Sequence, residues 1–179
     1  ASGPVQGTLN VSNTATLKVN TSGAMGGSFG TPGASFYSRL NITDGGTVQF
    51  ASTAPLTCGV GSSSEIKLLN GSTLKVLSIG TPSAPLTSFQ LSNSTLTVDR
   101  GVLSNPTVAP VVVDDLDVAA TNTVNVLGAV LVAGRFPLIK YTTLVNGGFT
   151  NFVLGNTSPG VTAYLTNNAP NSSIDLVVT

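Results

Sequence analysis

Three aspartates close together, Asp114, Asp115 and Asp117, form the densest group of side chains able to do chemistry. In a strand, residues two apart point to the same side, so Asp115 and Asp117 would present a pair of carboxylates. Such a pair can bind a cation such as Ca²⁺ or take part in acid–base catalysis. The surrounding sequence lacks the glycine-bearing loop and distal glutamate of a dedicated calcium site. Asp115 and Asp117 are therefore weak candidate metal ligands, with a solvated corner as the alternative.

Other residue types that enzymes use are scarce. The chain has no histidine, which excludes a Ser-His-Asp triad, and its only cysteine, Cys58, cannot build a zinc site. Arg135 and Lys140 could supply the base of a polysaccharide lyase, but their separation predicts opposite faces of a strand. Asp99 and Arg100 end a repeat and are expected to line a turn. We therefore predict no catalytic residues, no cofactor and a chain that is not an enzyme.

The composition favours strands solvated by hydroxyl and amide groups. Apolar residues make up 41% of the chain and charged residues 8%, and Ser, Thr and Asn dominate the polar set. Seven basic residues balance seven acidic ones, so nothing steers the chain towards nucleic acid, and low charge permits self-association. No apolar run approaches the roughly 20 residues that span a bilayer, so we expect no membrane insertion. The opening A-S-G-P predicts a processed chain or a piece of a longer one.

Five similar segments organise the sequence, and each resembles two short strands joined at a corner. Apolar residues alternate with polar ones, which sends the apolar side chains to one face. Asn, or an Asn-Gly or Asp-Gly pair, stands at most corners because these residues adopt left-handed backbone at low cost. The repeats are Leu9–Val19, Leu40–Phe50, Ile66–Val76, Phe89–Val98 and Leu116–Val126. The predicted corner residues are Asn13, Asp44, Gly45, Asn70, Gly71 and Asn93, with a weaker corner at Ala119-Ala120.

A strand–corner–strand unit cannot bury its apolar face alone. Stacking the next copy about 4.8 Å above it pairs the strands in parallel and extends the core. Repeats that begin 23 to 31 residues apart suit such a solenoid, because loops of variable length can separate the strands. We therefore predict an all-β, right-handed parallel β-helix of about five coils over residues 1–128. An antiparallel sandwich with hairpins at Asp44-Gly45 and Asn70-Gly71 is the rival fold.

The pattern changes after Val126. Short apolar segments follow one another between Gly, Asn and Pro turns at 146–148, 156–160 and 167–171. This spacing predicts antiparallel strands that close the coil, because the unpaired backbone groups of an open last rung would pair with other chains. Residues 129–179 are expected to form this cap as part of the same domain. The expected strands are Val130–Val132, Phe136–Tyr141, Phe149–Leu154, Val161–Leu165 and Ile174–Val178.

One polar column stands out when the repeats are aligned. A threonine precedes the first apolar residue of every second strand. Stacked coils would turn these residues into an outward-facing Thr ladder, which suits strands because threonine stacks well on itself. An ice-binding solenoid would present Thr-x-Thr in every coil, whereas here only Thr97 completes that motif. The ladder consists of Thr16, Thr47, Thr73, Thr95 and Thr123.

Aromatic rings and the first coil are the remaining candidate contact sites. Phe29, Phe36 and Tyr37 lie in or beside the first long loop, where exposed rings would form a platform for sugars, with coverage of the coil as the alternative. An exposed first rung near Leu9 would let copies stack end to end unless Ala1–Gly7 covers it. We therefore expect end-to-end self-association and surface glycans as partners, and no nucleic acid.

Two groups of residues resemble a known family. The strand motifs G-T-L-N-V (Gly7–Val11) and G-S-T-L-K-V (Gly71–Val76) resemble the repeats of autotransporter-type passenger proteins. The ending Phe136–Thr179, which opens F-P-L-I-K-Y-T-T-L-V-N-G-G-F, is similar to the segment that closes β-helical stretches in very large secreted bacterial proteins. This resemblance covers most of the chain and carries no catalytic residues over. It implies a β-helical fold, an extracellular or cell-surface location, and roles in adhesion, matrix or surface display.

The function expected from these features is structural and non-enzymatic. A spacer, an adhesin or a self-assembling filament or matrix subunit of a secreted or surface protein fits the missing catalytic residue types and the hydroxyl- and amide-rich surface. A carbohydrate-binding or polysaccharide-cleaving β-helix is the main alternative, and a groove lined by Asp115, Asp117 and an aromatic ring would support it. An ice-binding solenoid is the minor alternative.

Overall fold

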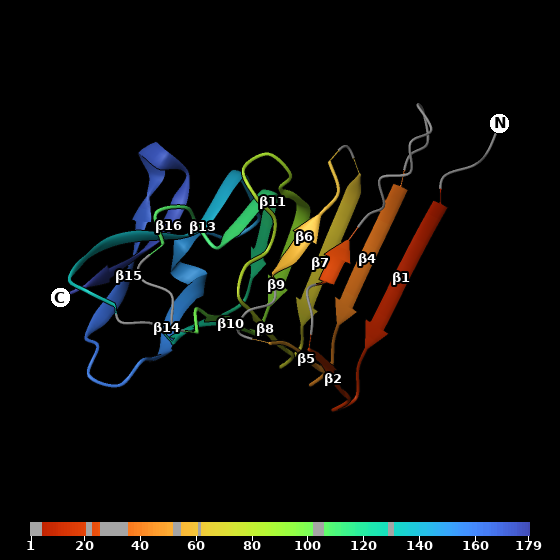
Figure 1. Ribbon diagram of the computed structural model, residues 1–179, viewed down its shortest axis with the longest axis horizontal. Coiled ribbons are helices and arrows are strands. Elements are labelled where there is room, and N and C mark those ends of the chain that lie inside the picture. The colour runs from red at the N-terminus through yellow and green to blue at the C-terminus, as the bar shows by residue number, and fades with distance from the viewer. Residues whose placement is uncertain are drawn as a thin grey trace.

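The computed structural model describes residues 5–20, 23–25, 36–51, 55–60, 62–101, 106–128 and 131–179. Strands make up 64% of the described residues, and the helical residues among them are two single turns of 3-10 helix, Phe149–Asn151 and Ala169–Asn171. Stacked coils of parallel strands form a β-solenoid of about five turns. This result confirms the predicted right-handed parallel β-helix and excludes the antiparallel sandwich. Figure 1 shows the strands stacked side by side along the longest axis of the molecule.

The first sheet has eight strands and forms the longest wall of the solenoid. Its strands pair in parallel from β1 through to β13, and β16 and β15 then pair in antiparallel fashion. In order across the sheet they are β1 (Val5–Val11), β4 (Phe36–Ile42), β7 (Ser63–Leu69), β9 (Leu86–Ser92), β11 (Val111–Ala119), β13 (Gly134–Val145), β16 (Ser173–Val178) and β15 (Ala163–Asn168).

The second sheet has six strands, all paired in parallel. From the first coil onward they are β2 (Thr16–Val19), β5 (Thr47–Phe50), β8 (Thr73–Val76), β10 (Thr95–Asp99), β12 (Asn122–Leu127) and β14 (Phe152–Thr157). A short third sheet pairs β3 (Gly23–Met25) with β6 (Leu56–Cys58). Single parallel bridges from Leu56 to Ile79 and from Ile79 to Val111 continue this third side.

The core lies between the walls and is built from columns of equivalent side chains. On the first sheet, Ile66 is the register partner of Leu40 on one side and of Phe89 on the other. On the second sheet, Leu74 lies between Val48 and Leu96 in the same way, and the exposed fraction of Ile66, Phe89 and Leu74 is 0%. Burial of the alternating apolar positions in every middle coil is what stabilises a unit that cannot fold alone.

The corners between the first and second sheets carry left-handed backbone. The first left-handed residue of each corner has φ between 49° and 55°, namely Asn13, Asp44, Asn70, Asn93 and Ala120. Gly45 and Gly71 follow with φ of 79° and 75°. The corners also stack, because the backbone N–H of Gly45 donates to the carbonyl of Asn70 at 3.0 Å. These contacts connect one coil to the next at the point where the chain leaves the first sheet.

Among the strands that the structure describes, antiparallel pairing involves the last two, β15 and β16. β13 still pairs in parallel with β11, and β14 with β12, so the two walls each gain a further parallel rung beyond the fifth repeat. β16 then pairs antiparallel with both β13 and β15. The strand expected at Val130–Val132 has no counterpart in residues 131 and 132, and residues 129 and 130 lie outside the described part. The predicted strand Phe136–Tyr141 lies within the longer β13.

Candidate functional site

The three aspartates predicted to be the chemical centre lie on β11. Asp117 accepts hydrogen bonds from Gln90 Nε2 at 3.2 Å and from Asn146 Nδ2 at 3.1 Å, which come from the coils on either side. Asp114 accepts one at 3.3 Å from the next rung, whereas the exposed Asp115 has no hydrogen-bond partner among the described residues. In the same part of the chain, no group of three or more His, Cys, Asp or Glu is placed to hold a metal ion. Asp117 thus links neighbouring rungs, and a metal site at Asp115 and Asp117 stays a prediction.

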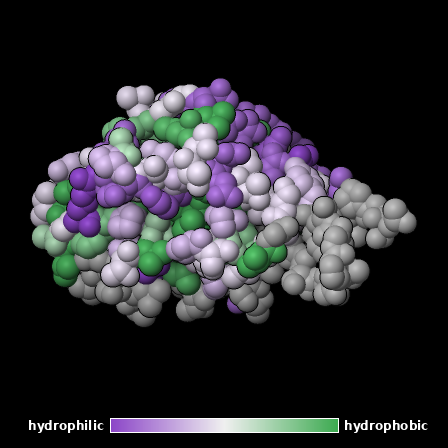
Figure 2. Space-filling view, turned by 90° about the horizontal axis from the view of Figure 1, so that it is seen from above, coloured by the Kyte–Doolittle hydropathy of each residue, from purple (hydrophilic) through white to green (hydrophobic). Residues whose placement is uncertain are grey.

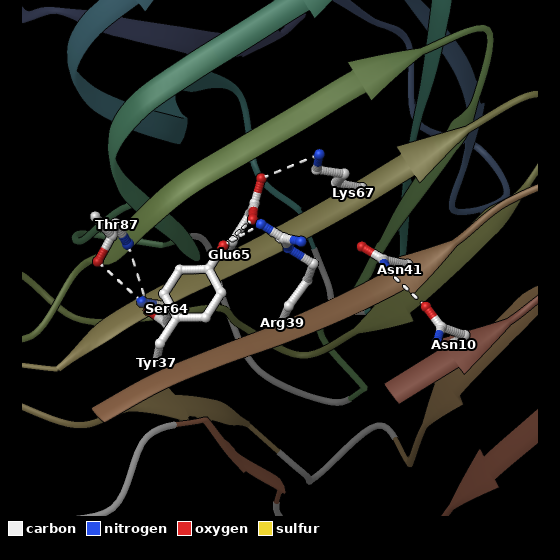
Figure 3. A network of polar contacts seen from close by, with 8 residues as sticks. All are labelled: Asn10, Tyr37, Arg39, Asn41, Ser64, Glu65, Lys67 and Thr87. Carbon is white, nitrogen blue, oxygen red and sulfur yellow. Dashed lines mark hydrogen bonds and ion pairs between the residues drawn. The ribbon is translucent and has the colours of Figure 1, made fainter. Parts of the chain in front are cut away.

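A cluster of hydrogen-bonded and ion-paired side chains lies on the first sheet, where β4 and β7 run side by side (Figure 3). Glu65 binds Arg39 Nε through Oε2 at 2.5 Å and Lys67 Nζ through Oε1 at 3.4 Å. The hydroxyl of Tyr37 donates to the same Oε2, and Arg39 Nη2 donates to that hydroxyl. One carboxylate therefore ties together three side chains from two adjacent coils.

The protonation state of this group follows from its contacts. Burial raises the pKa of Glu65, but the hydrogen bonds from Tyr37 and Arg39 and the charge of Lys67 outweigh burial, so the pKa is lowered on balance. The hydrogen bond to Glu65 raises the pKa of Tyr37. Glu65 is therefore an ionised acceptor with no proton to give, which suits a structural link better than general acid catalysis.

The aromatic platform expected for sugars is only partly described. Phe29 lies outside the described residues, and Phe36 begins β4. The ring of Tyr37 has the Arg39 guanidinium carbon 5.1 Å from its centroid, so a cation–π contact occupies one face. A sugar ring could therefore stack only on the opposite face of Tyr37.

The threonines of the second sheet lie in one column. Thr47 and Thr73 are register partners, and the column runs on through the second strand of every repeat. The parallel column two residues further along is mixed, because Lys75 pairs with Asp99 at 2.6 Å and Asn125 Nδ2 donates to Thr97 Oγ1 at 3.1 Å. Charged and amide side chains there interrupt the uniform hydroxyl surface that ordered water would need.

Arg135 and Lys140 share one side of β13, contrary to the prediction that they lie on opposite faces. The pairing of β13 with β16 shifts register between Pro137 and Ile139, where an extra residue bulges from the strand. The bulge reverses the alternation, so that Leu138 and Ile139 are both buried. Both basic side chains consequently line a cleft of about 510 Å³ beside the cap.

Asp175 on β16 faces this cleft and is nearly buried, with 2% of its surface exposed. Its Oδ2 accepts hydrogen bonds from Arg135 Nε and Asn168 Nδ2, both at 2.7 Å, and its Oδ1 accepts one from Ser173 Oγ at 2.6 Å. Burial raises the pKa of Asp175, but these three donors outweigh burial and lower it on balance. The sequence carried no signal for this cluster, because its members meet only after β13 and β16 pair.

The first coil leaves an apolar hollow of about 450 Å³ at its end of the solenoid. Leu9 is 50% exposed, whereas its register partner Leu40 is 5% exposed. Val5–Gly7 continue β1 in register with β4 instead of folding over this end. Ala1–Pro4 lie outside the described residues. Leu17 and Val48 line the same hollow from the second sheet.

In comparisons with known proteins, no family model, no curated protein and no solved structure matches the chain. In the described part of the chain, no helix has the length and apolar character needed to cross a bilayer.

Proposed function

We propose that the chain is a non-enzymatic structural module of a secreted or surface protein, acting as a spacer, adhesin or self-assembling subunit. The observation that carries this proposal is the way the carboxylates are used. Of the seven acidic residues, all except Asp115 accept hydrogen bonds from the chain itself, mostly from a neighbouring coil. Groups held in this way stiffen a rod, whereas an enzyme of this fold would need a free acid or base in a cleft.

The open first coil supports the self-assembling version of the proposal. Among the described strands, β1 and β2 each have a partner on one side only, so unpaired backbone groups and the apolar hollow lie at the same end. Unpaired strand edges are templates for a further strand. A second copy stacked here would continue both sheets and cover Leu9.

The location rests on the resemblance of Gly7–Val11, Gly71–Val76 and Phe136–Thr179 to autotransporter-type passenger proteins. A surface that avoids charge and uses hydroxyl and amide groups agrees with that setting, as Figure 2 illustrates with separate hydrophobic patches among hydrophilic side chains. We accordingly propose an extracellular or cell-surface location. Detection of the intact protein by antibody on unpermeabilised cells tests it, and a signal only after permeabilisation would contradict it.

Electron microscopy of the purified protein at high concentration tests the assembly. Filaments with a repeat matching one solenoid are the expected result. Only isolated particles at every concentration would overturn the self-assembling version.

The absence of catalysis is tested separately, by measuring release of reducing ends from a panel of polysaccharides. No release above the buffer rate is expected. Release that disappears in an Asp115→Asn/Asp117→Asn variant would show instead that the chain is a polysaccharide-cleaving enzyme.

A further inference from the structure

Two clefts near the cap share one wall. The cleft of about 510 Å³ that contains Arg135 and Lys140 shares the walls Pro82, Thr107, Val108 and Ala109 with a second cleft of about 430 Å³. The shared wall is formed by two loops, one before β9 and one before β11. We call the two clefts together the cap groove.

The cap groove gathers positive charge in a chain whose formal net charge is zero. Arg135 and Lys140 line one end and Arg100 lines the other. Among the described residues that line it, Asp175 is the single acidic one. Both oxygens of Asp175 are already engaged by donors of the chain, so its carboxylate is held within the protein.

Arg100 is the most informative member of the cap groove. Asp99, its neighbour in sequence, pairs with Lys75 and accepts a hydrogen bond from the backbone N–H of Gly101, so it lines the turn as the sequence predicts. The Nε of Arg100 is buried and has no hydrogen-bond partner among the described residues, and burial lowers the pKa of this guanidinium. A buried donor without an acceptor costs stability. The Arg100 side chain as a whole is only partly buried, so its charge can still meet an acceptor from outside the chain.

Arg135 can contact a ligand while it stays bound to Asp175. Its Nε donates to Asp175, which leaves the two terminal nitrogens of the fork able to donate elsewhere. The side chain is 48% exposed. A guanidinium fixed by a buried carboxylate is preorganised for a planar acceptor such as a carboxylate or sulfate.

The walls between the cations are apolar. Pro82, Val112 and Pro137 line the groove, and Val108 is 54% exposed beside them. The C–H faces of sugar rings pack on such surfaces, while the acidic groups of the same sugars would reach the cations at either end. A nucleic acid would instead favour aromatic rings for base stacking, and none of the described residues that line the cap groove is aromatic.

We propose that the cap groove binds a segment of an acidic polysaccharide, with Arg100 at one end and Arg135 and Lys140 at the other. This goes beyond the proposed structural function by giving the module a ligand. It does not depend on end-to-end assembly, because the groove lies beside the cap and the hollow lies at the first coil.

The test measures binding of fluorescein-labelled oligogalacturonate by anisotropy at low ionic strength, with dextran sulfate and neutral dextran as parallel arms. Binding of oligogalacturonate or of dextran sulfate, but not of dextran, is expected, and comparison of the two tells whether carboxylate or sulfate is preferred. The affinity should fall as salt is added. No binding of either acidic polymer, or equal binding of neutral dextran, would overturn the proposal.

The variants locate the site. Arg100→Gln/Lys140→Gln is expected to weaken binding by at least about tenfold, since each change removes a charge-assisted hydrogen bond. Lys140→Gln alone serves as a second variant, because this exposed side chain can change without disturbing Arg100. Lys18→Gln is the control matched to Lys140→Gln, since it removes one positive charge from an exposed site on the first coil, and it should alter affinity by less than about twofold.

Two outcomes would show that the binding is not the proposed one. Equal weakening by Lys18→Gln, with thermal unfolding unchanged in all variants, would reveal unspecific attraction to positive charge. Equal affinity for a single-stranded DNA oligomer of the same charge would contradict the preference for sugars. Filament formation is scored separately by electron microscopy, so either idea can fail without the other.

Discussion

Ala120 is the residue at which the repeat departs furthest from its own pattern. The other four corners place Asn or Asp at the first left-handed position. Ala120 adopts φ of 52° there, but its methyl side chain cannot form the hydrogen bonds to nearby backbone that Asn and Asp can form. Left-handed backbone costs an ordinary L-residue roughly 1 kcal/mol that glycine does not lose. Ala120→Gly is therefore expected to raise the free energy of unfolding by about 0.5–1 kcal/mol, measured by urea denaturation.

Ala119→Gly is the matched control for that change. Ala119 is equally exposed but ends β11 without left-handed backbone, so glycine there adds only unfolded-state freedom. Ala119→Gly is therefore expected to lower the free energy of unfolding by about 0.5–1 kcal/mol. If both substitutions changed the free energy of unfolding in the same direction, the assignment of strain to Ala120 would be contradicted.

Asp175 makes the stability of the cap depend on pH. Because the pKa of Asp175 is lowered in the folded protein, its contribution is complete above its ordinary pKa and is lost as the pH falls through the folded value. Urea unfolding followed from neutral to strongly acidic pH should therefore show falling stability in the acidic range. Asp175→Asn should be less stable at neutral pH and should lose part of this dependence; an unchanged profile in the variant would contradict the role given to Asp175.

Residues differ in how far the sequence alone predicts them. The corner residues were predictable because their backbone requirement is local and only a few residue types satisfy it. Asn122 was not: it is 1% exposed, and its side chain accepts from Ser94 Oγ at 2.8 Å and donates to the Ala119 carbonyl at 3.0 Å. The partner Ser94 comes from the previous coil, so this buried link exists only after stacking.

At the scale of the strands, stability should concentrate in the middle coils. Leu68 on β7 is 0% exposed with β4 and β9 on either side, whereas Leu9 on β1 is 50% exposed. Leu68→Ala is expected to lower the free energy of unfolding by about 3–5 kcal/mol, because the neighbouring rungs cannot close the cavity that it leaves. Leu9→Ala should cost about 1 kcal/mol or less. Urea denaturation of both variants measures the difference, and equal losses would mean that the first coil is as tightly packed as the third.

The strands also show where periodicity stops being informative. Both walls were predictable because five repeats carry the same alternation, and equivalent residues are now register partners. The third sheet was missed, since β3 and β6 have three residues each and no alternation can be recognised over that length. The bulge in β13 was missed because two adjacent apolar residues, Leu138 and Ile139, fit either phase of the pattern. That bulge decides which face Arg135 and Lys140 share.

The whole molecule has two unlike ends, and this difference determines how copies can associate. The edge strands at the first coil are the parallel strands β1 and β2, while those at the other end are β14 and β15, of which β15 pairs antiparallel with β16. A contact between unlike ends is head to tail, and repeated contacts of this kind build open filaments unless the rotation closes a ring. The solenoid should therefore grow in one direction.

The strength of that growth should depend on Leu9. Sedimentation velocity of the wild-type protein is expected to show a mass that rises from 18.0 kDa with concentration. Leu9→Lys should stay at the monomer mass, because a buried, unpaired charge at the junction costs several kcal/mol. Val60→Lys is the control, since Val60 is 78% exposed but does not line the hollow. Association that survives Leu9→Lys, or that Val60→Lys removes equally, would place the contact elsewhere on the molecule.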